Sequence, residues 1–195
     1  MLAVLVACGP RLGAQGVGGL SADRYDPMFR KYTKRYFGPA YDWRVFKAQG
    51  MAESGLDTAA QSRAGARGIM QLMPSTFRAI KSHAPDLVSI DDPEWNIAAG
   101  IQHNRALWRM WEEAATPLDH RQFMFASYNA GRVTILRAQR VARLSRLDPR
   151  VWSSIEAVAI RVRRWRQRET LGYLRKIETL LERFDPEGRL PGRRR

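Results

Sequence analysis

The sequence predicts a mainly α-helical fold, a compact domain of about seven to nine helices. Apolar residues recur at helical spacing along most of the chain, helix start and stop signals separate these segments, and alternating strand patterns are nearly absent. With 195 residues, of which 45% are hydrophobic, the chain is long enough and apolar enough to bury the core of one ordinary domain.

The first predicted helices lie between residue 25 and the glycine at position 55. Helical signals begin at Tyr25. Farther along, Trp43, Phe46 and Gly50 share one face of a second predicted helix. Gly55 is a stop signal, because glycine readily adopts the left-handed conformation that ends many helices.

A further helix start is predicted at Asp92, which can cap a helix, followed by Pro93 in the first turn and by Glu94 near the positive end of the helix dipole. Ile97, Ile101, Trp108 and Trp111 follow this start at helical spacing.

Three more helices are predicted over residues 121–127, 151–168 and 171–184.

The N-terminal segment has some features of a targeting signal. Residues 1–7 are apolar but lack the positive charge that precedes the apolar core of a full signal peptide. Leu5-Val6-Ala7-Cys8 resembles a bacterial lipobox, which predicts lipidation of Cys8; the alternative is an ordinary signal peptide that contains a cysteine. The glycine-rich tether ends at residue 22, a catalytic domain is predicted over residues 23–185, and a basic tail over 186–195.

The chain is strongly basic, with 33 Lys and Arg against 19 Asp and Glu and a net charge of +14. Such a charge predicts association with polyanions. The densest stretch, residues 161–168, permits three interpretations. It could be a nucleic-acid site, or a solvated helix face with Val162 and Trp165 turned inward. We favour the third, a nonspecific electrostatic contact with anionic wall polymer or phospholipid, and expect no specific nucleic-acid partner.

No metal and no cofactor are predicted. Cys8 is the only cysteine, so no internal disulfide can form. His83, His103 and His120 are scattered along the chain without the spacing of a metal site.

Glu53 is the candidate catalytic residue. It lies in the last turn of a predicted helix, where the negative end of the helix dipole disfavours an ionised carboxylate. Met51 is close in sequence, and Ile69 and Met70 could close over the carboxyl group, in which case desolvation would raise the pKa of Glu53. A carboxyl group that is protonated at neutral pH can act as a general acid in glycosidic cleavage. The alternative is a solvated residue at a helix end.

Two glycines follow at three-residue spacing, Gly65 and Gly68. They favour a turn at which the backbone comes close to a ligand, although a plain loop is the alternative.

Four motifs follow one another along the chain. They are Glu53-Ser54 with Ser62, Gly65-Ala66 and Gly68-Ile69-Met70-Gln71-Leu72-Met73-Pro74; Asn96-Ile97-x-x-Gly100; Ala126-Ser127-Tyr128-Asn129-Ala130-Gly131; and Glu169-Thr170-x-x-Tyr173. In this order they resemble the signature of the SLT-type lytic transglycosylases, which share the goose-type lysozyme-like fold. The opening Tyr41-Asp42-Trp43-Arg44 is similar to the catalytic domain of the membrane-bound F subgroup of this family. The chain departs from the family pattern at His103-Asn104, usually Tyr-Leu, and at Ser127, usually Ala.

The resemblance implies a lytic transglycosylase with one catalytic carboxylate. Glu53 would protonate the oxygen that links N-acetylmuramic acid to N-acetylglucosamine, and would then accept the proton of the muramic C6 hydroxyl. That hydroxyl attacks C1 and closes a 1,6-anhydro ring. Because the nucleophile belongs to the substrate, the second carboxylate of ordinary glycosidases is dispensable. Asp57 is therefore interpreted as a loop or cap residue.

The resemblance also implies substrate-binding residues in two separate parts of the sequence. Ser62 would orient the muramic acid, and Gln71 with the backbone at Met70 would bind the N-acetyl groups. Tyr128 and Asn129 would line the cleft.

Near the end of the chain, Tyr173 would hydrogen-bond Glu53 or the sugar. For Tyr128 and Tyr173, core packing with a satisfied hydroxyl is the alternative. Glu169 is interpreted as a structural residue that pairs with a nearby arginine.

Two other functions stay open at this point. A muramidase would use water and would require a second carboxylate across the cleft. A non-catalytic wall- or nucleic-acid-binding module on the same fold would bind regardless of Glu53→Gln.

The expected partner is the glycan strand of peptidoglycan. The protein is expected to be a monomer in the periplasm, anchored to the outer membrane through Cys8.

Overall fold

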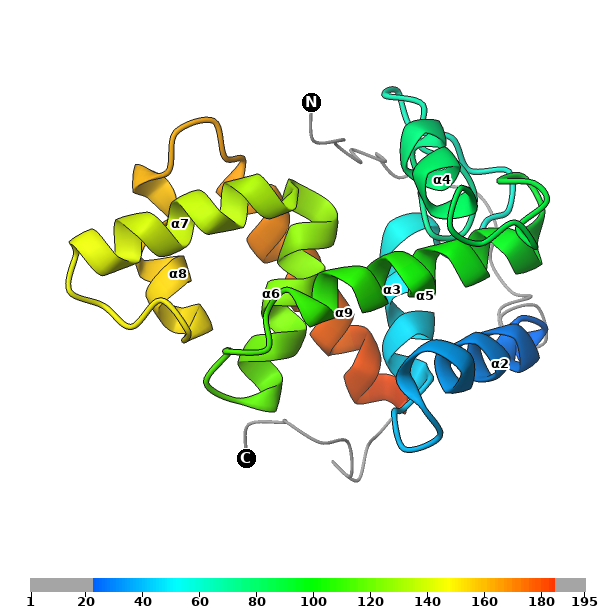
Figure 1. Ribbon diagram of the computed structural model, residues 1–195, viewed down its shortest axis with the longest axis horizontal. Coiled ribbons are helices and arrows are strands. Elements are labelled where there is room, and N and C mark those ends of the chain that lie inside the picture. The colour runs from blue at the N-terminus through cyan, green and yellow to red at the C-terminus, as the bar shows by residue number, and fades with distance from the viewer. Residues whose placement is uncertain (1–22, 185–195) are drawn as a thin grey trace. The chain divides into compact units, whose positions relative to one another are not determined.

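The computed structural model describes residues 23–184, which form two compact units, 23–102 and 103–184 (Figure 1). The predicted lipobox with Cys8, the tether and the basic tail over 186–195 lie outside these residues. Within the described part, the chain is organised as helices α2 to α9 and one 3-10 helix, and the only β-structure is two isolated bridges. The mainly α fold class is therefore confirmed.

The first unit contains α2 (Asp26–Phe37), α3 (Arg44–Ser54) and α4 (Pro74–Lys81), and α5 (Pro93–Arg109) begins in it. In Figure 1, α2 is blue and α3 is cyan, and the two helices pack against each other. Gly50 permits this close packing, because a Cβ atom at this position would lie 3.1 Å from the ring of Phe29 on α2.

The predicted start and stop signals of the first unit are confirmed. The Asp92 carboxylate accepts hydrogen bonds from the backbone N–H groups of Glu94 (2.8 Å) and Trp95 (3.2 Å), and so caps α5. Gly55 ends α3 with a left-handed φ of 69°. The prediction for Trp111 is wrong in one respect, since α5 ends at Arg109 and Trp111 is buried in the turn that follows.

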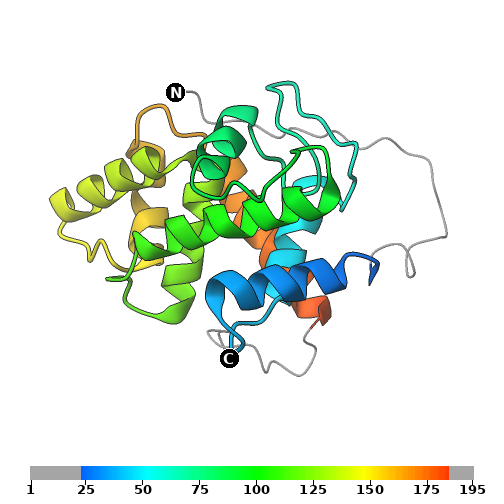
Figure 2. The same cartoon turned by 45° about the vertical axis from the view of Figure 1, so that its right-hand side comes forward.

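The second unit contains α6 (Pro117–Ala130), α7 (Arg132–Leu144), α8 (Trp152–Val158), the 3-10 helix η1 (Ala159–Arg161) and α9 (Gln167–Phe184). Helix α6 packs against α7, α8 and α9, and α7 packs against α8. Figures 1 and 2 both show α7, in yellow-green, alongside the golden α8. No helix within residues 23–184 is both long enough and apolar enough to span a bilayer.

Polar and aromatic contacts fix α6 at the centre of this unit. The carboxylate of Asp119 accepts a hydrogen bond from the backbone N–H of Trp152 (2.8 Å) and so caps α8. Phe123 meets the Trp152 ring edge-on, with ring centroids 5.4 Å apart. Arg121 forms an ion pair with Glu178 of α9 at 3.2 Å.

The prediction of a single helix over residues 151–168 is wrong. Helix α8 ends at residue 158, one 3-10 turn follows, and α9 begins only at residue 167. Between them Arg164 has a left-handed φ of 60°. The break allows the indole of Trp165 to turn back and donate a hydrogen bond to Thr170 (2.9 Å), and both Val162 and Trp165 are buried. These two side chains therefore point inward as predicted, but from a loop and not from a helix.

Candidate active site

Glu53 lies in the last turn of α3, and its exposed fraction is only 7%. Most residues of α3 are buried, and Glu53 is the last buried residue before the helix ends. The N–H of Gly55 closes that end by donating to the carbonyl of Met51 (3.0 Å). The structure therefore places Glu53 at a buried helix C-terminus, as the sequence predicted, and not at a solvated helix end.

The segment that was predicted to lie near Glu53 packs on the last turns of α3. The hydroxyl of Ser54 donates to the carbonyl of Ile69 (2.9 Å). A Cβ atom at Gly50 would lie 3.1 Å from Cγ2 of Ile69. Ile69 and Met70 are fully buried, so this segment belongs to the core of the unit and is held against α3.

The glycines of this segment form the turn that their spacing predicted. Gly65 and Gly68 have left-handed φ values of 88° and 71°, and Gln71 follows with a φ of 45°. The chain folds back on itself because Arg67 and Leu72 exchange two backbone hydrogen bonds of 2.9 and 3.0 Å. The loop is therefore ordered by its own backbone.

Asn96 of α5 attaches this loop to the rest of the unit. Its exposed fraction is 1%. The side-chain oxygen accepts a hydrogen bond from the backbone N–H of Met70 (2.8 Å), and the side-chain nitrogen donates to the carbonyls of Arg67 (3.0 Å) and Ile90 (2.9 Å). One buried amide thus satisfies three backbone groups in the loop and in the segment that leads into α5.

Two glycines make this attachment possible. A Cβ atom at Gly68 would lie 2.6 Å from the side-chain nitrogen of Asn96, and one at Gly100 would lie 2.7 Å from Cβ of Met70. Asn96 and Gly100 are four residues apart and so share one face of α5. In the sequence these two residues belong to one motif, and their i, i+4 spacing is the signal that they face a common contact.

Ser62 and Gln71 use part of their polar groups within the loop. The hydroxyl oxygen of Ser62 accepts a hydrogen bond from the backbone N–H of Ala66 (3.0 Å). The side-chain nitrogen of Gln71 donates to the carbonyls of Ala60 (3.1 Å) and Gly68 (2.9 Å). A substrate contact by Ser62 would therefore use the hydroxyl hydrogen or the second lone pair of its oxygen, and one by Gln71 would use the side-chain oxygen.

In the second unit, the last two motifs are joined by hydrogen bonds. Asn129 lies in the last turn of α6, and its side-chain oxygen accepts a hydrogen bond from the hydroxyl of Thr170 on α9 (2.9 Å). The same hydroxyl accepts from the indole of Trp165 (2.9 Å). Tyr173 follows Thr170 by one turn, with an exposed fraction of 9%. The structure thus brings Asn129 and the α9 motif together, and gives the Asn129 oxygen a structural partner.

The two departures from the family pattern have physical explanations. Ser127 accepts a hydrogen bond from the indole of Trp111 (3.0 Å), which a family alanine could not do. The ring of His103 lies against that of Tyr128, with centroids 5.2 Å apart and an interplanar angle of 58°. Burial lowers the pKa of His103 from 6.5 to about 4, so the imidazole is neutral at pH 7.

We expect His103 to make the stability of the protein pH-dependent. Its pKa is lower in the folded chain, so unfolding takes up a proton below pH 6.5, and stability falls as the pH drops from 6.5 towards 4. The loss attributable to His103 should reach about 2 kcal/mol at pH 5. Denaturant unfolding of wild type and His103→Phe at pH 7.5 and pH 5 measures it, because the variant keeps a ring against Tyr128 but cannot titrate. Equal losses in both proteins would contradict the assignment.

The two structural interpretations of acidic residues are confirmed. Asp57 is exposed, and its carboxylate accepts a hydrogen bond from the backbone N–H of Ala59 (2.8 Å), as expected of a turn residue. Glu169 forms an ion pair with Arg166 at 3.3 Å.

The predicted site residues therefore fall into two groups, each within one unit. Glu53, Ser62, Met70 and Gln71 belong to the first unit, on α3 and the loop that α5 holds. The second group lies on α6 and α9 of the second unit and comprises Tyr128, Asn129 and Tyr173.

Comparison with known proteins gives consistent matches. Residues 28–148 match the transglycosylase SLT domain family. The chain is 31% identical over 170 residues to membrane-bound lytic murein transglycosylase F of Desulfosudis oleivorans, an alignment that covers 83% of this chain and 36% of the relative. It is 26% identical to the protein of the same name from Vibrio campbellii, covering 80% of this chain and 28% of that one. The chain thus spans about a third of the length of these curated relatives.

Among solved structures, the chain resembles the 70 kDa soluble lytic transglycosylase of Escherichia coli, with a TM-score of 0.62 and 22% identity. This match covers 88% of the chain and 27% of the larger protein. The complex of the 70 kDa soluble lytic transglycosylase with bulgecin A matches with a TM-score of 0.59 and 20% identity. These likenesses confirm the predicted lysozyme-like helical fold.

Proposed function

The chain belongs to the transglycosylase SLT domain family, and on that premise we propose that it is a peptidoglycan lytic transglycosylase in which Glu53 is the catalytic acid and base. The observation that carries the proposal is the position of Glu53, buried at the C-terminal end of α3 beside a loop that is held in place by α5. Such a site favours a protonated carboxyl group, which is the form that a general acid requires.

The proposed reaction balances without water. The Glu53 carboxyl group gives its proton to the glycosidic oxygen, and the bond from C1 of N-acetylmuramic acid to that oxygen breaks. The C6 hydroxyl of the same sugar attacks C1, and its proton passes to the Glu53 carboxylate. The products are a 1,6-anhydromuramic end and a free N-acetylglucosamine hydroxyl, and Glu53 is protonated again.

Binding roles follow for the other residues. We propose that Ser62 and the Gln71 side-chain oxygen contact the sugars from the first unit, together with the backbone at Met70. Tyr128 and Tyr173 are proposed to contact substrate from the second unit. Asn129 is proposed to contribute through its side-chain nitrogen, because its oxygen accepts from Thr170.

The mass of the soluble products tests the reaction. After incubation with purified peptidoglycan, the proposal predicts anhydro-muropeptides as the main products. Products heavier by one water would show a muramidase and would require a second carboxylate. Binding to peptidoglycan with no soluble product would favour a non-catalytic module.

The place of action is also a proposal. Peptidoglycan as substrate implies the periplasm, and lipidation of Cys8 would tether the enzyme to the outer membrane as a monomer. Metabolic labelling with a radioactive fatty acid, with Cys8→Ser as the control, tests the anchor.

A further inference from the structure

Helix α7 has an unusual outer face. Its inward side is made of small or branched residues, Ile135, Ala138 and Ala142, which are fully buried against the second unit. Its outward side mixes large apolar side chains with arginines at helical spacing. That outward stripe consists of Val133, Leu136, Arg137, Arg140, Arg143 and Leu144.

The 3-10 helix η1 and the loop behind it extend this surface. The side chain of Arg161 donates a hydrogen bond to the hydroxyl of Ser145 at the end of α7 (2.9 Å), so the two segments are joined. Ile160 of η1 is 81% exposed, and Leu144 of α7 is 75% exposed. We call the α7 stripe together with residues 160–164 the basic-apolar face.

Exposed apolar side chains concentrate here. Of the seven large hydrophobic residues that are exposed in the described chain, five lie in this part of the second unit. Isolated exposed apolar residues need no explanation, but a cluster of them marks an interaction surface. The five residues are Val133, Leu136, Leu144, Leu147 and Ile160.

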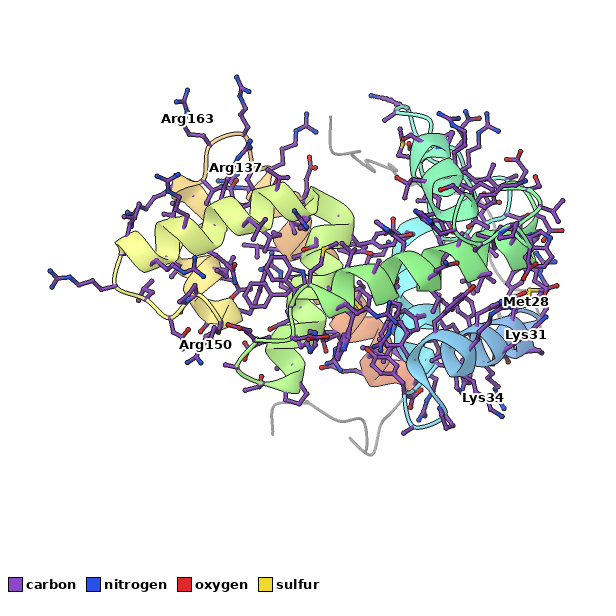
Figure 3. All side chains as sticks on the ribbon, viewed as in Figure 1. Met28, Lys31, Lys34, Arg137, Arg150 and Arg163 are labelled. Atoms are coloured by element: carbon purple, nitrogen blue, oxygen red, sulfur yellow. The ribbon has the colours of Figure 1, made fainter. Side chains whose placement is uncertain are left out.

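The charge of the face has one sign only. Residues 131–147 and 157–168 contain ten arginines and no Asp or Glu. Among residues 23–184, Arg137, Arg140 and Arg163 form no salt bridge. In Figure 3, Arg137 and Arg163 extend from one edge of this unit, whereas Arg150, which is paired with Asp148 at 2.9 Å, lies at the opposite edge.

The combination of exposed apolar side chains and arginines on this face indicates which class of partner it binds. Glycan strands and their peptide stems would satisfy the arginines but would leave Leu144 and Ile160 in water. A single-stranded nucleic acid would require exposed aromatic platforms, and the one aromatic residue of this loop, Trp165, is buried. The interface of an anionic bilayer provides phosphates for guanidinium groups and an acyl boundary for aliphatic side chains.

We propose that the basic-apolar face binds the surface of an anionic phospholipid membrane, with its arginines on the lipid phosphates and Leu144 and Ile160 inserted at the acyl boundary. The helix α7 would lie in the plane of the membrane surface. This contact does not rest on the catalytic proposal, because none of its residues is a proposed substrate contact.

Vesicle sedimentation tests the proposal on the full chain carrying Cys8→Ser, so that no attached lipid contributes. The vesicles contain phosphatidylcholine alone or equal parts of phosphatidylcholine and phosphatidylglycerol. Binding is expected to the mixed vesicles only. Arg137→Gln with Arg163→Gln should weaken it by about 30-fold, and Leu144→Ser with Ile160→Ser by about tenfold.

Matched control pairs remove the same groups elsewhere. Lys34→Gln with Arg78→Gln removes two exposed charges, and Val88→Ser with Met110→Ser removes two exposed apolar side chains. Both should bind vesicles within about twofold of the parent chain. The effect of Leu144→Ser with Ile160→Ser on vesicle binding distinguishes a membrane from another polyanion.

If Leu144→Ser with Ile160→Ser bound vesicles like the parent chain, the inserted membrane contact would be wrong. It would be equally wrong if the variants of the face kept their vesicle binding and lost binding to purified peptidoglycan or to an oligonucleotide. Weaker vesicle binding by both pairs, with peptidoglycan binding retained, is the result that the proposal requires.

Discussion

Glu53→Gln is expected to lower the rate of anhydro-muropeptide formation by about a thousandfold or more. The amide of glutamine fills the same space but cannot give a proton to the glycosidic oxygen, and it cannot take one from the C6 hydroxyl. Both proton transfers of the proposed reaction depend on this one group, so no second residue replaces it. The initial rate of soluble product release from purified peptidoglycan, followed by mass spectrometry, measures the effect.

Two controls separate loss of chemistry from loss of structure. Glu53→Gln should keep its melting temperature within a few degrees and should still sediment with peptidoglycan. Asp57→Asn, which changes an exposed turn carboxylate four residues away, should keep its activity within about twofold. If Glu53→Gln retained a tenth of the wild-type rate, Glu53 would not be the acid and base. If Asp57→Asn were inactive, a two-carboxylate reaction would return as an explanation.

The location of Glu53, the proposed catalytic group, was predictable because local signals coincide there. Gly55 ends a helix by its left-handed φ, and this places Glu53 in the last turn, which the structure confirms. Asp92 starts α5 by a capping bond that depends only on neighbouring residues. Such features are readable from a sequence, since their causes lie within a few residues of their effects.

Helix α7 and the break before α9 were not predictable in the same way. Helix α7 begins at Arg132, directly after α6 and Gly131, with no side-chain capping hydrogen bond, so no local start signal of the kind seen at Asp92 marks it in the sequence. The break before α9 accompanies the burial of Trp165 and its hydrogen bond to Thr170, which helix propensity does not reveal. The exposed Leu136 and Leu144 of α7 agree with the proposed membrane contact, because a face that inserts at the acyl boundary cannot be purely polar.

The attachment of the loop around Gly68 also depends on a contact that no local pattern shows. Asn96 lies 26 residues from Met70 along the chain, and yet its buried amide binds the backbone of the loop that packs on the end of α3. Met70 and Asn96 belong to two of the sequence motifs, but only the structure shows that they touch. The second motif therefore affects the surroundings of Glu53 indirectly, by holding the loop that packs on the last turns of α3.

Asn96→Ala is expected to lower the free energy of unfolding by about 2–4 kcal/mol, because it removes the partner of the Met70 N–H and of the Ile90 carbonyl and takes one of two hydrogen bonds from the Arg67 carbonyl. Denaturant unfolding at pH 7.5 measures the loss. A loss below about 1 kcal/mol would show that the loop is held by other contacts.

A double-mutant cycle with Gly68→Ala tests the contact itself. The Cβ atom of an alanine at this position would lie 2.6 Å from the Asn96 side-chain nitrogen, so the single variant should lose about 3 kcal/mol from strain in the backbone and from this overlap. Gly55→Ala provides the matched control, since Gly55 has nearly the same φ of 69° and open space around it, and should lose only about 1–2 kcal/mol. In the double variant with Asn96→Ala the overlap disappears. Its total loss should therefore be smaller than the sum of the single losses by about 1 kcal/mol or more, whereas strict additivity would show that Gly68 and Asn96 are not in contact.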